Sequence, residues 1–193
     1  MKIAFFITAF VLGARFAAAQ GTFVYDQQST GTTDSSVALT QTPFGQSFTP
    51  TLDSLNFVDL QLIDFGSSAS TVAVNVRSDS ITGSLLGTST PIMLPASSSS
   101  TYDFLFSDPI SLTPGTQYYF EPVIVSGGSS VLANITFIQY TGGDLIQSGA
   151  ARTDRDLWFR EGVVTSVPEP STSALFVIGG GVLFGYCRKR RTG

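Results

Sequence analysis

Apolar and polar residues alternate with a period of two through the middle of the chain. Three rows of apolar residues show the pattern: Val58, Leu60 and Leu62; Val72, Val74 and Val76; and Tyr102, Phe104 and Phe106. Successive side chains of a β-strand point to opposite faces of its sheet. Each row therefore predicts a strand with one buried face and one exposed face.

Turn-forming residues separate these rows. They are Thr82-Gly83, the serine-rich run 95–100, Thr113-Pro114-Gly115-Thr116, Ser126-Gly127-Gly128 and Thr141-Gly142-Gly143-Asp144. No segment of the middle region has a convincing helical period. About eight to ten strands at this spacing predict an all-β fold, an antiparallel β-sandwich of the jelly-roll kind.

An apolar stretch near the N-terminus has the pattern of a secretory signal peptide. Lys2 precedes apolar residues from Ile3 to Ala14, and the small residues Ala17 and Ala19 follow. Small residues at these positions suit signal peptidase. We expect a signal peptide at residues 1–19, cut between Ala19 and Gln20.

A second uncharged run, from Ser173 to Cys187, lies near the C-terminus. As a helix it would be roughly 22 Å long, short of the ~30 Å hydrocarbon core, but bilayer thinning and snorkelling can cover the difference. The basic cluster after it comprises Arg188, Lys189, Arg190 and Arg191. The pattern predicts one transmembrane helix with the basic cluster in the cytoplasm. The alternative is a buried helix followed by a basic tail.

The residues directly before this run are Val167, Pro168, Glu169 and Pro170. This motif, the short apolar run and the basic cluster together resemble the PEP-CTERM sorting signal of exported bacterial proteins. In that family a membrane-embedded exosortase recognises Pro-Glu-Pro and leaves its substrate at the cell surface or in the extracellular matrix. The resemblance implies that residues 167–193 are a sorting signal, used after an inner-membrane intermediate. The pattern does not require Cys187.

Residues 20–166 remain between the two end segments, which is enough chain for one domain. This region has four Arg, no Lys and thirteen Asp or Glu, giving a formal charge of −9. Such a surface repels phosphate backbones, which argues against nucleic-acid binding. The single cysteine, Cys187, lies outside the region, so we expect a domain without disulfides.

The absence of histidine from the sequence limits the kinds of catalytic and metal site that the chain can form. It excludes Ser-His-Asp triads and zinc sites built from His and Cys. Two carboxylates alone could support glycoside hydrolysis. The candidate pairs are Asp154 with Asp156, and Asp103 with Asp108 or Glu121. Acidic residues on exposed strand faces and in turns are ordinarily solvated, so we expect a non-catalytic domain without a cofactor.

Calcium is the candidate cation, because loop carboxylates and carbonyls suit its flexible coordination. The residues concerned are Asp144, Asp154 and Asp156, in loops that do not match an EF-hand. The alternative is that these acids are solvated and balanced by Arg152 and Arg155.

Three aromatic residues are candidates for ligand contact. Tyr118 and Tyr119 are adjacent, so on a strand they point to opposite faces and one of them is expected to be exposed. Trp158 lies between apolar neighbours and is expected in the core.

The order of elements over residues 44–160 also resembles sandwich modules found ahead of the anchors of bacterial surface proteins, which are similar in outline to carbohydrate-binding jelly rolls. We therefore expect the domain to associate with extracellular polysaccharide. The alternative is a structural or adhesive protein whose acidic face binds calcium or partner proteins. A two-carboxylate glycosidase is a third hypothesis.

Overall fold

A computed structural model of the chain describes residues 21–137 and 140–165. The predicted signal peptide, the sorting signal and the C-terminal transmembrane helix lie outside the described residues. Residues 23–165 form one compact unit. Among the residues described, no helix is long and apolar enough to span a membrane.

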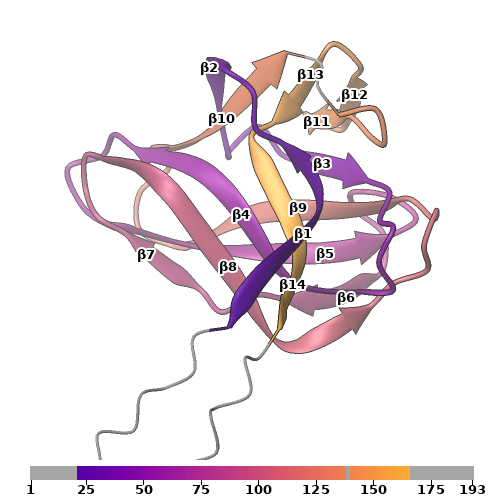
Figure 1. Cartoon of the computed structure of the whole chain (residues 1–193). Helices are drawn as coiled ribbons and strands as arrows, with labels where there is room; N and C mark the ends of the chain where they lie inside the picture. Colours follow the sequence, from indigo (N-terminus) through magenta and orange to yellow (C-terminus); the bar gives the residue numbers. More distant parts are fainter. Residues whose placement is uncertain (1–20, 138–139, 166–193) are drawn as a thin grey trace, which may run out of the picture. The chain divides into compact units, whose positions relative to one another are not determined.

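The unit is built from two antiparallel sheets (Figure 1). The first sheet contains β1 (Thr22–Ser29), β2 (Thr33–Ala38), β4 (Ser54–Asp64), β8 (Ser98–Ser111), β10 (Val131–Phe137), β13 (Arg155–Leu157) and β14 (Phe159–Thr165). Its order is β1-β14-β4-β10-β13, with β8 also paired to β4 and β2 also paired to β10.

The second sheet has the order β12-β11-β3-β9-β5-β6, with β7 also paired to β5. Its strands are β3 (Gly45–Phe48), β5 (Ser70–Ser78), β6 (Leu85–Thr88), β7 (Ile92–Leu94), β9 (Tyr118–Ser126), β11 (Leu145–Gln147) and β12 (Ala150–Arg152). The two sheets confirm the predicted all-β, antiparallel fold. Its jelly-roll topology stays a prediction.

The long strand β4 organises the first sheet. One edge of β4 pairs with β8 along its length, and the other edge pairs first with β14 and then with β10. The register places Asp59 of β4 between Asp103 of β8 and Arg160 of β14. Three charged side chains from distant parts of the sequence thus meet in one row across the sheet.

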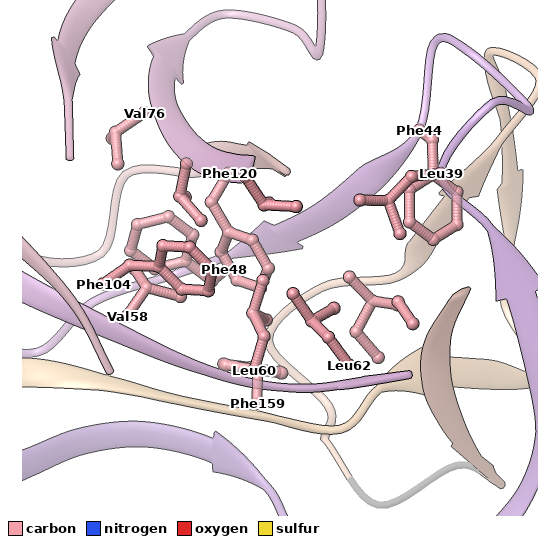
Figure 2. Close-up of a cluster of buried hydrophobic side chains, with 14 of the residues drawn as sticks. Leu39, Phe44, Phe48, Val58, Leu60, Leu62, Val76, Phe104, Phe120 and Phe159 are labelled. Atoms are coloured by element: carbon pink, nitrogen blue, oxygen red, sulfur yellow. The ribbon is translucent and has the colours of Figure 1, made fainter. Parts of the chain in front are cut away.

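The core lies between the two sheets and is rich in phenylalanine (Figure 2). Phe120 of the second sheet lies 5.2 Å from Phe159 of the first sheet and 5.9 Å from Phe48, measured between ring centroids. The predicted valine and leucine rows are fully buried. In the third row Phe104 and Phe106 are buried, whereas Tyr102 is partly buried against the core. The alternation therefore identified the buried faces correctly.

The predicted strand number was too low. The described residues contain fourteen strands, whereas the spacing of turns indicated about eight to ten. Several of the missed strands have three or four residues, such as β7, β11 and β12. A segment of three residues is too short to show an alternating pattern, so its pairing depends on neighbouring strands rather than on its own sequence.

Candidate functional site

Polar and aromatic side chains occupy neighbouring register positions on the outward side of the first sheet. Val58, Leu60 and Leu62 point into the core, so the alternate residues Asp59 and Gln61 point outward. We call this surface the outer-face strip. It comprises Tyr25, Asp59, Gln61, Thr101, Asp103, Asn134 and Arg160.

Arg160 is held between two aromatic rings of the first sheet. Its Cζ lies 5.0 Å from the centroid of the Tyr25 ring and 5.1 Å from that of Trp158. Its Nη1 donates a hydrogen bond of 3.4 Å to the Tyr25 hydroxyl. Guanidinium groups are attracted to aromatic faces, so the two rings orient this side chain. Tyr25 remains 45% exposed and offers an accessible ring beside it.

Trp158 is buried, as expected, although it is not part of the main hydrophobic cluster between the sheets. Its neighbours Leu157 and Phe159 belong to the core cluster and Trp158 does not. Trp158 lies between β13 and β14, and its indole packs against the Arg160 guanidinium of the outer-face strip. Its backbone N–H donates to the Asn134 carbonyl of β10 at 2.9 Å. Trp158 therefore supports the outer-face strip rather than the space between the sheets.

Asp59 and Asp103 face each other across β4 and β8. Burial raises the pKa of the Asp59 carboxyl to about 7. The Asp103 carboxylate adds to the rise through charge repulsion and a shared hydrogen bond, and Arg160 opposes it. Asp59 is only 3% exposed, whereas Asp103 is exposed. Asp103 is the solvent-accessible member of this pair.

Two buried polar atoms beneath the outer-face strip, Asp59 Oδ1 and Arg160 Nε, have no hydrogen-bond partner. The two residues lie opposite each other in the register of β4 and β14. Buried polar groups are nearly always paired, so these two atoms are exceptions within the sheet.

A polar hollow of about 220 Å³ continues the strip from Asp59. It is lined by Gln61, Ser99, Ser100, Thr101 and Asn134. The Asn134 amide donates to Gln61 Oε1 at 3.2 Å and accepts from the Ser36 hydroxyl at 2.7 Å. These bonds fix the amides, while hydroxyls supply further donors and acceptors to the opening.

The two tyrosines chosen from the sequence point to opposite faces of β9, as predicted. Tyr118 is buried in the core, and its hydroxyl accepts the Thr113 N–H at 3.0 Å. Tyr119 is partly exposed on the second sheet, and its hydroxyl donates to Gln117 Oε1 at 2.9 Å. Neither belongs to the outer-face strip. Tyr25, which does, was not selected, because no local pattern distinguishes it from other strand tyrosines.

The three acids proposed for calcium have different surroundings. Asp156 is buried, and its carboxylate accepts hydrogen bonds from the Gln46 amide at 2.8 Å and the Tyr140 N–H at 3.1 Å. Asp154 is exposed, 3.3 Å from Arg155 Nε. Asp144 is partly exposed just before β11. Within residues 21–137 and 140–165 no group of three or more acidic side chains could hold a metal ion. Calcium binding stays a prediction.

The structure pairs Asp103 with a different carboxylate from those chosen in the sequence. Its partner is Asp59, whereas Glu121 lies on the second sheet, 2.9 Å from Arg77. The pairing depends on strand register, which sequence spacing does not reveal. A two-carboxylate glycosidase stays a hypothesis.

Comparison with protein families matches residues 166–191 to the PEP-CTERM protein-sorting motif. The chain carries a PEP-CTERM sorting signal. The match takes in Val167, Pro168, Glu169 and Pro170 and extends through the basic cluster to Arg191. The PEP-CTERM motif implies export, a membrane-anchored intermediate and processing by an exosortase. No curated protein matches the chain.

Proposed function

We propose that this exosortase-sorted protein associates, without catalysing a reaction, with polysaccharide at the cell surface or in the extracellular matrix. The outer-face strip is the binding surface in this proposal. The PEP-CTERM motif delivers the domain to a compartment where such polymers occur. Signal peptidase, acting after Ala19, is the other processing partner in this proposal.

The observation that carries the proposal is the composition of the strip. An exposed tyrosine ring lies beside an arginine, a carboxylate pair and an amide-lined hollow. Sugar units need an apolar face against an aromatic ring and hydrogen bonds to their hydroxyls, and these side chains provide both. The hollow is smaller than the ~300 Å³ of typical ligand pockets. It would therefore take one unit of a polymer whose neighbouring units lie along the open sheet.

The jelly-roll resemblance supports the proposal at the level of fold. Carbohydrate-binding jelly rolls are similar in outline, but a fold by itself does not assign a ligand. The proposed ligand is therefore inferred from the side chains of the outer-face strip and not from the sandwich fold.

The test is binding of the full-length protein, purified in detergent, to a glycan array and to polysaccharide isolated from the native cells. Tyr25→Ala should weaken binding about tenfold, equivalent to roughly 1.4 kcal/mol. Tyr119→Ala is the matched control, because it removes a partly exposed ring from the second sheet. If Tyr119→Ala abolishes binding and Tyr25→Ala does not, the site lies on the other sheet. The absence of binding to any glycan would contradict the proposal.

A further inference from the structure

In the outer-face strip one cation lies near an exposed carboxylate. Arg160, Asp59 and Asp103 form one row across β14, β4 and β8, in which Asp59 is buried and Asp103 is exposed. The domain around them contains no lysine and has a formal charge of −9. Of the other three arginines, Arg77 is paired with Glu121 on the second sheet, Arg152 is exposed on β12 of the second sheet, and Arg155 at the start of β13 lies 3.3 Å from Asp154. An approaching anion therefore meets an acidic surface in which Arg160 is the nearby cation.

Arg160 is poorly placed to bind an anion. Its guanidinium is stacked between Tyr25 and Trp158, and its strand neighbour is Asp59. A carboxylate that reached Arg160 would also approach the exposed Asp103. Like charges repel as strongly as opposite charges at the same distance attract, so the attraction would be largely cancelled.

A hydroxyl group suits the same surroundings well. A hydroxyl group both donates and accepts hydrogen bonds, whereas a carboxylate only accepts them. The amides and hydroxyls around the hollow of Gln61 and Asn134 have the same mixed character.

We propose that the outer-face strip selects neutral, hydroxyl-rich sugar units and discriminates against sugar units that carry a carboxylate. This inference rests on the proposed function and specifies its class of ligand. Asp103 is the residue that enforces the discrimination, because it is the exposed carboxylate of the row.

The test compares polymers that share a backbone and differ in carboxylate content. The probes are hydroxyethylcellulose against carboxymethylcellulose, dextran against carboxymethyl dextran, and native-cell polysaccharide before and after chemical reduction of its carboxyl groups. Binding of the full-length protein in detergent is measured by affinity electrophoresis at fixed pH and salt. We expect the carboxylated member of each bound pair to bind at least tenfold more weakly.

Asp103→Asn should reduce this discrimination at least threefold, because the amide keeps the shape of the carboxyl and removes its charge. Asp108→Asn is the matched control. Asp108 is also an exposed acid of β8, but it borders a different hollow, beside β6. It therefore changes the net charge equally without altering the strip. Thermal unfolding of both variants verifies that they fold.

The outcomes separate this inference from the proposed function. Tighter binding to the carboxylated polymers would overturn the inference and leave polysaccharide association standing. Equal effects of Asp103→Asn and Asp108→Asn would also overturn it, because the discrimination would then arise from the charge of the whole domain. If no glycan on the array and none of these polymers were bound, polysaccharide association itself would be contradicted.

Discussion

Glu161 of β14 is a fully buried acid beside the N-terminal strand. Its Oε1 accepts the Gln27 N–H at 3.1 Å, and its Oε2 is buried without a partner. Burial, and then the charge of Asp26, raise the pKa of Glu161 to about 8, against a smaller lowering by the Gln27 hydrogen bond. Glu161 is therefore mainly protonated at neutral pH.

Asp26 shows the opposite behaviour one strand away. Burial by itself would raise its pKa, but hydrogen bonds from the N–H of Leu52 and from the hydroxyl and N–H of Thr51 outweigh burial and lower it. The protonation states of Asp26 and Glu161 thus differ because different hydrogen-bond donors surround the two carboxyls, and not because of residue type.

Glu161→Gln should make the domain more stable in alkaline solution. The folded protein holds the Glu161 proton more tightly than the unfolded chain, whose carboxyl titrates near 4.5. The contribution of Glu161 to stability is therefore fully present below about pH 4.5 and is lost as the pH rises through about 8. At pH 9 the variant should be more stable by on the order of 2–4 kcal/mol, and at pH 4 close to wild type.

Urea unfolding followed by circular dichroism from pH 4 to 9 provides the measurement. The pKa of Asp59 is also raised, so part of the pH dependence of stability should remain in the Glu161→Gln variant. Glu121→Gln serves as control, because Glu121 is paired with Arg77 and should show no alkaline gain. Parallel pH profiles for wild type and Glu161→Gln would show that Glu161 ionises normally in the fold.

At the scale of elements, strand β1 is joined to the sandwich through a close contact with β14. A Cβ atom built on Gly162 would lie 2.1 Å from the Val24 carbonyl oxygen, and the φ of Gly162 is +154°. Both facts require glycine at this position. The rings of Phe23 and Tyr25 also pack edge-on against Phe57, at 4.8 and 5.7 Å between centroids. The position of Tyr25 in the strip therefore depends on this strand pairing.

Gly162→Ala should loosen β1 while leaving the core folded. The added methyl group cannot fit against the backbone of β1, so the two strands must separate locally. Hydrogen exchange of residues 22–29 should become at least tenfold faster, and polysaccharide binding should weaken because Tyr25 is displaced. Gly128→Ala is the control, since its Cβ would meet the flexible Ser130 side chain at 3.1 Å. Unchanged exchange in β1 would contradict this account of the strand junction.

At the scale of the whole molecule, β1 begins and β14 ends at the same end of the sandwich, because the two strands are neighbours (Figure 1). The last described residue, Thr165, is two positions before Val167. The PEP-CTERM motif therefore follows the folded domain with almost no linker in sequence. Processing near the motif would leave the sandwich intact.

Replacing Pro168, Glu169 and Pro170 by alanine should block processing. The exosortase family recognises Pro-Glu-Pro, so the variant should retain its C-terminal segment and remain in the membrane fraction. Intact mass and fractionation of protein from native cells provide the measurement. The double variant Ser171→Ala and Thr172→Ala, which leaves Pro-Glu-Pro unchanged, should be processed normally. An uncut wild-type protein in the membrane fraction would mean that the segment is a plain anchor.

The sequence by itself determined the export route and the all-β class. Both depend on local order: a short motif before an apolar run and a basic cluster, and alternation long enough to identify strands such as β4 and β5. Hydrophobic burial enforces such alternation, so Val58 and Leu60 could be assigned to the core from their spacing.

The residues of the outer-face strip could be identified only from the tertiary structure. Asp59, Asp103 and Arg160 are far apart in sequence and meet because β4 pairs in one register with both β8 and β14. A shift of one residue in either pairing would turn those side chains toward the core. Register follows from packing of the whole sandwich, which is why the carboxylate pair and the stacked arginine could not be found from local patterns.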